Sequence, residues 1–140
     1  MSAPRRILAV DYGDSRTGLA ATDWTGTIAV PLPRIDERDP ERLARAIAAV
    51  AAERETELVV LGMPLNVDGS AGQRAERTAA FQARLAAALS CPLATVDESH
   101  STDEAHERLK TGGLKAAKRK QLADSIAALV ILERYRGRRG

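Results

Sequence analysis

The stretch Arg6-Ile-Leu-Ala-Val-Asp11-Tyr-Gly13 decides the predicted fold. Four apolar residues in a row predict a strand that becomes buried, and the run ends at an aspartate followed by a turn-forming glycine. Two more strands are predicted at residues 17–22 and 27–35, each preceded by turn residues. Three strands joined by short turns predict an antiparallel meander.

After the meander, the spacing of the apolar residues becomes that of helices that alternate with short strands. Asp39 and Pro40 predict the start of a helix that ends near residue 55, because aspartate caps and proline fits the first turn. Ser70 and Gln73 form a capping box that predicts a second helix. Further elements are predicted as strands at 57–61 and within 91–97, a short helix from Ser101 to about 110, a basic linker at 111–118 and a last helix near 119–136.

This order of elements predicts an α/β fold of the ribonuclease H-like layout. The meander supplies an antiparallel half, and the crossover connections add parallel strands beside the first one. The expected result is a five-stranded mixed sheet with helices on both faces. A length of 140 residues suits one domain over residues 1–140.

Composition narrows the class of protein. The single cysteine, Cys91, excludes an internal disulfide, and no apolar run is long enough to span a membrane, so a cytoplasmic protein is expected. Residues 1–107 hold 11 Lys and Arg against 17 Asp and Glu, whereas residues 108–140 hold 10 against 2. Such a basic end is typical of a surface that binds a polyanion, with a solvated tail as the alternative.

Three acidic segments are predicted to lie where an ionised carboxylate is unfavourable unless it binds a cation or a ligand. Asp11 ends the first strand, and ligands collect at the carboxyl ends of strands in such sheets, although Asp-x-Gly also forms ordinary turns. Asp97 and Glu98 end the fifth strand, and alternation sends one of them to the site. Asp124 shares a helical stripe with apolar residues, so it is expected to face protein and to bind either a metal ion or an arginine.

Together these carboxylates predict a metal site. Carboxylates from the ends of two strands and one helix can form an all-oxygen site for Mg²⁺ or Mn²⁺, and Asp11 is best placed to bridge two ions. The two histidines, His100 and His106, are too few and too poorly spaced for a zinc site.

Four segments in order carry a resemblance to a known family. Residues 11–20 (DYGDSRTGLA) resemble the first motif of the YqgF family, whose members are described as pre-16S rRNA nucleases and as Holliday-junction-resolvase-like (RuvX-type) proteins. Residues 62–70 (GMPLNVDGS), 97–102 (DESHST) and 124–128 (DSIAA) resemble its second, third and fourth motifs. One position departs from the family pattern, because Ser99 stands where the family usually has arginine.

The resemblance implies a ribonuclease H-like, metal-dependent nuclease. It places the catalytic and metal-binding roles on Asp11, Glu98 and Asp124, with two Mg²⁺ or Mn²⁺ ions as cofactors. We expect the phosphates of the nucleic acid to be bound by residues around these carboxylates, namely Gly13, Arg16, Asn66, Ser70, Ser101, Thr102, Lys118 and Arg119.

The predicted function is therefore hydrolysis of phosphodiester bonds in structured nucleic acid, with processing of pre-16S rRNA ends first. A Holliday junction resolvase acting on branched DNA is the main alternative, and it would need a symmetric homodimer to cut two strands. A non-catalytic nucleic-acid-binding module of the same fold also stays open. An actin-like ATPase would need two copies of the fold, and 140 residues supply one.

Overall fold

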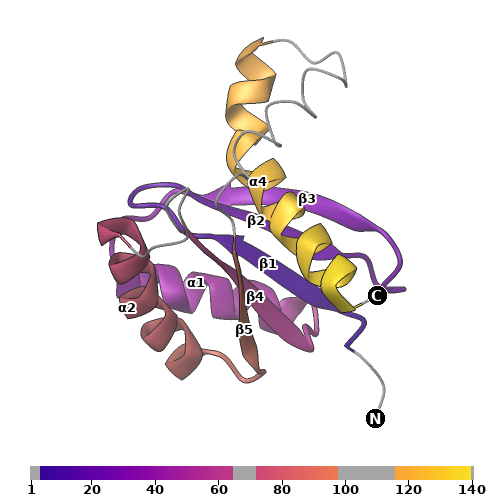
Figure 1. Cartoon of the computed structure of the whole chain (residues 1–140). Helices are drawn as coiled ribbons and strands as arrows, with labels where there is room; N and C mark the ends of the chain where they lie inside the picture. Colours follow the sequence, from indigo (N-terminus) through magenta and orange to yellow (C-terminus); the bar gives the residue numbers. More distant parts are fainter. Residues whose placement is uncertain (1–3, 65–71, 98–115, 140) are drawn as a thin grey trace.

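The computed structural model describes residues 4–64, 72–97 and 116–139, and within the last helix it describes the side chains of residues 125–137 (Figure 1). The strands are β1 (Ile7–Asp11), β2 (Thr17–Thr22), β3 (Ala29–Ile35), β4 (Leu58–Met63) and β5 (Leu93–Asp97). The helices described are α1 (Pro40–Glu53), α2 (Gln73–Ala88) and α4 (Ala116–Arg139). Within this part of the chain, no helix has the length and hydrophobicity that a membrane span requires.

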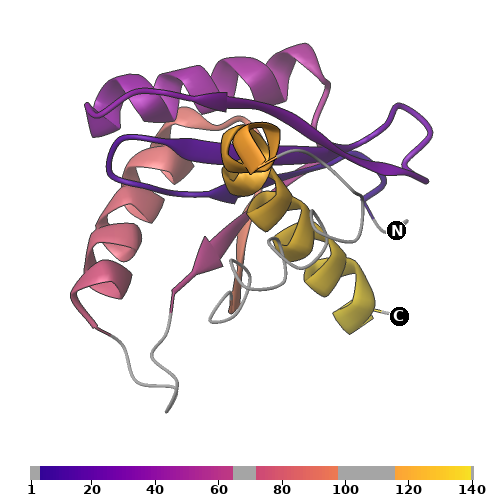
Figure 2. The same ribbon diagram turned by 90° about the horizontal axis from the view of Figure 1, so that it is seen from above.

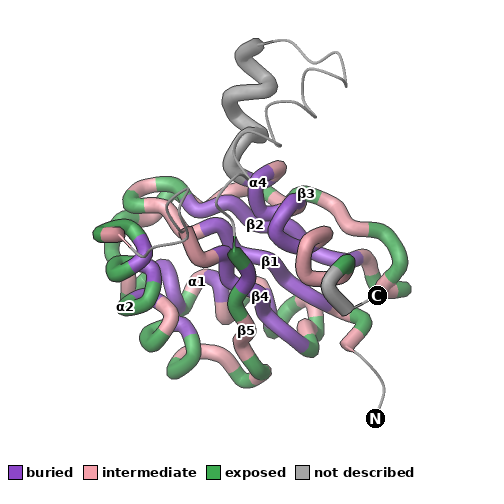
Figure 3. Tube along the Cα trace, in the orientation of Figure 1, coloured by how far each residue is buried: buried purple, intermediate pink, exposed green. Residues whose placement is uncertain are grey.

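The strands form one mixed sheet in the order β3-β2-β1-β4-β5. Antiparallel pairing joins β1, β2 and β3, while β4 and β5 pair in parallel with β1 and with each other. The predicted meander with added parallel strands is thereby confirmed. The central strands β1, β2 and β4 are almost wholly buried, as their long apolar runs require (Figure 3).

Helices cover both faces of the sheet, as predicted. Figure 2 shows α1 and α2 on one side and α4 on the other. The first core lies under α1 and α2 and contains Leu8 and Val10 of β1, while the second lies under α4 and contains Ile7 and Ala9. Successive residues of β1 therefore face opposite cores, which fixes the direction of every side chain along this strand.

The predicted helix starts were right at one helix and wrong at two. Asp39 caps α1 by accepting a hydrogen bond from the backbone N–H of Arg42 at 2.9 Å. The capping box at Ser70 is a wrong prediction, because α2 begins at Gln73 with Gly72 as its cap and without a side-chain cap. The last helix begins at Ala116, so residues 116–118 of the predicted linker are helical. The predicted helix at 101–110 lies outside the described residues.

The edge strand β3 is irregular near the end of the sheet where β1 terminates. Its pairing with β2 shifts register between Thr17 and Leu19, and it contains Pro31 and Pro33, which cannot donate to a ladder. Prolines and an irregular register are common ways of protecting an exposed edge from pairing with another strand. The carbonyl of Leu32, in the same strand, accepts a hydrogen bond from α4.

Candidate active site

Asp11 is the last residue of β1, and its carboxylate lies on the α4 side of the sheet. Ile7 and Ala9 belong to the α4 core, and the period of two assigns Asp11 to the same face. The residue is only 8% exposed. A buried aspartate at the carboxyl end of a central strand matches the position predicted for the first metal ligand.

Glycines flank Asp11 on both neighbouring strands. The antiparallel register pairs Asp11 with Gly18 of β2. The parallel register that pairs Val10 with Leu61 brings Gly62 of β4 alongside Asp11 on the other side. Neither neighbour has a side chain, so no Cβ of the adjoining strands stands beside the carboxylate, and both glycines are themselves buried.

The loop after Asp11 is tightly built, and Gly13 makes it possible. A Cβ at this position would collide with the carbonyl oxygen of Arg16, so a backbone close approach explains the glycine. The N–H of Gly13 donates to Oγ1 of Thr17 at 3.4 Å, which closes the turn. Arg16 is exposed on this turn, where its guanidinium is open to solvent at the same end of the sheet as Asp11.

Helix α2 holds the same loop from the opposite face. The ring of Tyr12 stacks on Phe81 with centroids 4.3 Å apart and planes 9° apart. Arg77 pairs with Asp14 at 3.3 Å, although both side chains are largely exposed and the pair is weak. The buried Phe81 is therefore the main support of the loop, and it fixes the backbone that follows Asp11.

Helix α4 crosses the face on which Asp11 lies. The hydroxyl of Ser125, itself buried, donates to the carbonyl of Leu32 in β3 at 2.6 Å. Ala128 and Ile131 are fully buried and Tyr135 packs against the same core, so three members of the stripe predicted for Asp124 face the sheet. Asp124 itself lies in α4 one residue before Ser125, and its side chain is outside the described part.

Strand β5 separates its two acidic candidates by face. Val96 belongs to the α4 core, so alternation turns Asp97 to the opposite face from Asp11. Asp97 is exposed, and its carbonyl accepts a hydrogen bond from Arg134 of α4 at 2.8 Å. Of the two predicted carboxylates, Asp97 therefore has the wrong orientation for the site. Glu98 lies outside the described residues.

The structure thus places part of the predicted site. Asp11, Gly13 and Arg16 lie together at one end of the sheet, on the end of β1 and the turn that follows it. Among the described residues, no group of three or more potential metal ligands occurs. The remaining candidates fall outside the described positions or side chains, namely Asn66, Ser70, Glu98, Ser101, Thr102, Lys118, Arg119 and Asp124.

Two features of the site were missed in the sequence. The flanking glycines, Gly18 and Gly62, were read only as parts of motifs, although a glycine inside an apolar strand is itself a sign of close approach. The support of the loop by Phe81 was also missed, because a contact between Tyr12 and a helix about 70 residues later leaves no local pattern.

Comparison with known proteins matches this geometry to a family of nucleases. A family model described as RuvX, Holliday junction resolvase, matches residues 5–136. A protein of Chloroflexus aurantiacus named "Putative pre-16S rRNA nuclease" is 40% identical over 129 residues, which cover 92% of this chain and 84% of that protein. A protein of the same name from Synechococcus elongatus is 38% identical over 128 residues, covering 91% and 86%.

Solved structures of resolvases share the fold. RuvC of Thermus thermophilus, in a complex with a Holliday junction substrate, superimposes with a TM-score of 0.57 at 17% identity, covering 89% of this chain and 90% of that one. A fowlpox virus resolvase in complex with junction DNA gives a TM-score of 0.54 at 13% identity, covering 94% and 97%. At these identities the likeness establishes the ribonuclease H-like fold alone.

Proposed function

Since this chain belongs to the RuvX (YqgF) family, it is a nuclease, and we propose that it uses divalent metal ions to hydrolyse phosphodiester bonds at the ends of pre-16S rRNA. The four motifs predicted the family and the nuclease activity, and the family match over residues 5–136 supports both. The choice of RNA rests on the names of the relatives that are 38–40% identical. We also propose that residues 1–140 act as one nuclease domain in the cytoplasm.

One observation carries the proposed chemistry, namely the buried carboxylate of Asp11 between two glycines. A bound cation would stabilise the ionised form of a carboxylate that is only 8% exposed. Gly18 and Gly62 place no side chain beside this carboxylate, and we propose that a cation and a phosphate oxygen approach it there. Oxygen ligands of this kind suit Mg²⁺ and Mn²⁺, so the residues present fit the metal.

Two further carboxylates are proposed to complete the site. Glu98 directly follows Asp97 at the end of β5, and we propose that it is the second carboxylate of the site. Asp124 belongs to the α4 stripe whose described members face the sheet. When bound, the metal would lower the pKa of a water molecule and stabilise the leaving oxygen.

The chain's own groups would then position the substrate. Arg16, exposed on the turn after Asp11, is proposed to bind a phosphate of the backbone. Asp11 would orient its carboxylate with little reorganisation, because the Tyr12–Phe81 stack and the Gly13 turn hold the backbone next to it. The remaining phosphate contacts are proposed for Gly13, Asn66, Ser70, Ser101, Thr102, Lys118 and Arg119.

The test is metal-dependent cleavage of three substrates side by side. RNA containing a pre-16S end, single-stranded DNA and a four-way DNA junction are incubated with the protein and Mg²⁺ or Mn²⁺, with EDTA as a blank. We expect RNA to be cut, and Asp11→Asn to remove the activity. The matched control is Glu41→Gln, which removes an exposed carboxylate of α1, on the opposite face of the sheet from Asp11 (Figure 2).

Junction DNA is the second candidate, because the family model itself carries the description of a Holliday junction resolvase. Symmetric cutting of a junction needs two active sites related by a two-fold axis. Preferential cleavage of the junction, together with a homodimer in solution, would replace rRNA processing as the function. Failure to cut any of the three substrates would overturn both candidates.

A further inference from the structure

The β2–β3 hairpin, at the opposite end of β1 from Asp11, carries a surface that the proposed cleavage does not use. Trp24 is the sole tryptophan of the chain and is 57% exposed, and Ile28 of the same hairpin is 59% exposed. They are the two large hydrophobic residues that stand exposed in the described part of the molecule. Exposed apolar side chains on an ordered loop indicate a binding surface.

The hairpin is rigid rather than frayed. Asp23 and Ile28 close it through a backbone hydrogen bond of 2.8 Å, and the Asp23 carboxylate accepts further bonds from Thr25 and Thr27. Gly26 has a φ of 76°, and a Cβ there would meet Arg5 at 2.7 Å, so the turn packs directly on the start of β1. Trp24 is therefore presented in one place before any partner binds.

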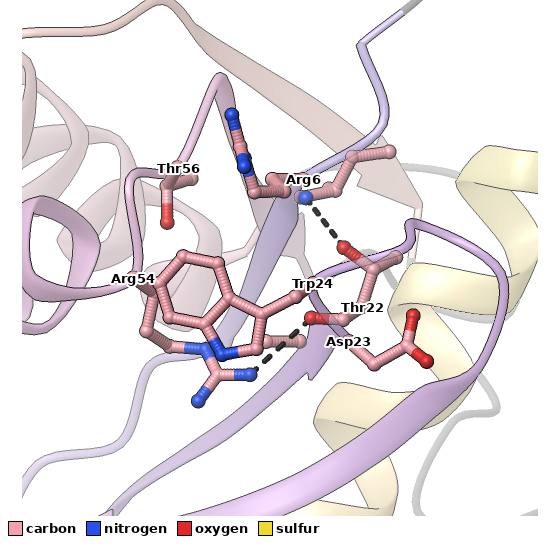
Figure 4. A pocket seen from close by; sticks show the side chains of 8 residues that line it. Arg6, Thr22, Asp23, Trp24, Arg54 and Thr56 are labelled. Carbon is pink, nitrogen blue, oxygen red and sulfur yellow. Dashed lines mark hydrogen bonds between the residues drawn. The ribbon is translucent and has the colours of Figure 1, made fainter.

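Arginines surround the tryptophan. The guanidinium of Arg6 lies 5.9 Å from the centroid of the Trp24 ring. Arg54 lines the same pocket and donates to the carbonyl of Thr22 at 3.3 Å, as Figure 4 shows beside the Trp24 ring. An arginine has five N–H donors, so a single bond to a carbonyl leaves most of them for a ligand. Arg5 is exposed next to Gly26.

The acidic groups near this surface are already engaged in the fold. Asp23 accepts bonds inside the turn, which lower the pKa of its carboxyl. Glu57 accepts the backbone N–H groups of Arg5 and Arg6 at 3.3 and 3.2 Å. Both carboxylates keep their negative charge, and Glu57 also pairs with the Arg6 guanidinium at 3.9 Å. Arg5, Arg6 and Arg54 therefore stand against two carboxylates, which leaves the surface weakly positive beside one indole ring.

A groove continues from Trp24 along the edge of the sheet. It has a volume of about 540 Å³ and lies between α1 and β3. Its floor is apolar, with Leu19, Leu32 and Val50, and its rim carries Arg34, Arg54 and Glu53. Arg34 is paired with Asp36 at 3.0 Å, which leaves Arg54 as the rim arginine next to Trp24. An apolar floor beside an indole ring and an arginine suits a chain that presents flat bases on one side and phosphates on the other.

We propose that this hairpin surface, made of Trp24, Ile28, Arg5, Arg6 and Arg54, binds a single-stranded segment of the RNA substrate away from the cleavage point. A base would stack on Trp24, and the arginines would pair with the adjoining phosphates. The exposed indole ring and the weakly positive charge together favour a nucleic acid strand over an apolar protein segment. This inference rests on the proposed function for the identity of the substrate.

The geometry sets the length of RNA that can use both sites. The five residues of β1 rise about 3.3 Å each, so the hairpin lies on the order of 15 Å from Asp11. Asp11 lies on the α4 face of the sheet and the groove on the α1 face, so the RNA has to pass around the edge of the sheet. At about 3.4 Å per stacked nucleotide, this path takes more than roughly five nucleotides. Substrates with a shorter single-stranded flank cannot reach Trp24 while they occupy the active site.

The test uses the intrinsic fluorescence of the single tryptophan. The full-length protein is titrated in EDTA with a 12-nucleotide oligouridylate, with oligothymidylate and with polyphosphate of equal charge. We expect saturable quenching of Trp24 by the RNA, weaker quenching by the DNA and none by polyphosphate, which has no bases. By anisotropy of labelled RNA, Trp24→Leu is expected to bind about tenfold more weakly. The matched control Arg45→Gln, which removes an exposed arginine of α1, should bind as the wild type does.

Two results would overturn the inference. Absence of quenching, or unchanged RNA affinity in Trp24→Leu, would reject the surface, while cleavage by the same preparation would keep the proposed function. Trp24 emission that changes with protein concentration and not with RNA would identify the surface as a contact between copies of the chain. Conversely, Trp24-dependent binding in a protein that cleaves no substrate would reject the proposed function and retain this surface.

Discussion

The two ends of β1 differ in which side chains are buried and which are exposed. At the carboxyl end, Asp11 is buried, and the neighbouring positions Gly18 and Gly62 have no side chains. At the amino end, Trp24 is exposed and has arginine side chains next to it. A buried carboxylate between glycines is the arrangement on which we base the proposed metal site, and an exposed indole with arginines is the one on which we base the proposed RNA surface.

The largest expected effect comes from the carboxyl end. Asp11→Asn should lower cleavage by more than about 100-fold, because loss of even a residue that supports a metal ligand typically costs 10–100-fold. The fold should persist, since asparagine has nearly the same shape as aspartate. Cleavage rates and far-UV circular dichroism check both statements, and full activity in the variant would mean that Asp11 is not a ligand.

The second prediction tests whether the cleavage needs a glycine beside Asp11. Gly62→Ala places a methyl group next to the carboxylate, so cleavage should fall by about tenfold or more, whereas binding to the hairpin surface should be unchanged. The matched control is Gly137→Ala, because a Cβ at Gly137 meets nothing within 4 Å. A folded Gly62→Ala variant with wild-type activity would show that the cleavage does not need a glycine there.

The residues changed in these two variants also illustrate how much could be predicted from the sequence. All five strands and the order of the sheet were predictable, because apolar runs such as residues 7–10 and the turn at Gly13 are local signals. Asp11 was predictable for the same reason, since it ends such a run. The start of α2 was not, because Ser70 and Gln73 satisfied the capping pattern while the helix begins after Gly72.

Features that depend on register or on distant contacts were hidden in the sequence. The two glycines flank Asp11 only because of the specific pairing of β1 with β2 and with β4. The arginines near Trp24 are at positions 5, 6 and 54, and no local sequence pattern links Arg54 to the other two. Such clusters follow from topology, so they can be recognised only after the strand order is known.

The third prediction compares the basic residues at the two ends of α4. Changing Lys115, Lys118, Arg119 and Lys120 together to alanine should weaken binding to any nucleic acid and flatten its dependence on salt. Each lost phosphate contact removes about 0.7 from the log–log slope on single strands and about 0.9 on duplexes. Affinity measured across a series of salt concentrations is the check, and the cleavage rate at saturating substrate should change little.

The control for this prediction lies at the other end of the same helix. Arg134 and Arg136 donate to the carbonyls of Asp97 and Thr27 at 2.8 and 3.0 Å, so they serve the fold. Their change to glutamine should alter the salt slope less than the four-residue change does. An equal loss of slope would mean that both sets of basic residues contact phosphates, whereas an unaltered slope in the four-residue variant would identify the basic end as a solvated tail.

The smallest expected effect is that of low pH on the β2–β3 hairpin. Hydrogen bonds from the Thr25 hydroxyl and from backbone N–H groups lower the pKa of Asp23 below its ordinary value of 3.8. The stability that these bonds contribute is present above pH 3.8 and is lost as the pH falls through the lowered pKa. Trp24 emission should therefore change in that range before far-UV circular dichroism does.

Asp23→Asn is the variant that checks this assignment. It should remove the acid-dependent change in Trp24 emission, because an amide does not titrate. Asp36→Asn, which changes an exposed carboxylate paired with Arg34, should leave that change in place. An acid transition that persists in Asp23→Asn would assign the effect to another group.

The most direct test of the central claim is anomalous diffraction from crystals of the full-length protein grown with Mn²⁺. The account predicts a manganese peak within about 2.5 Å of an Asp11 carboxylate oxygen, with Glu98 and Asp124 among the other ligands. A side chain of Asp124 that points to solvent or lies more than about 10 Å from Asp11, or manganese bound elsewhere, would contradict it.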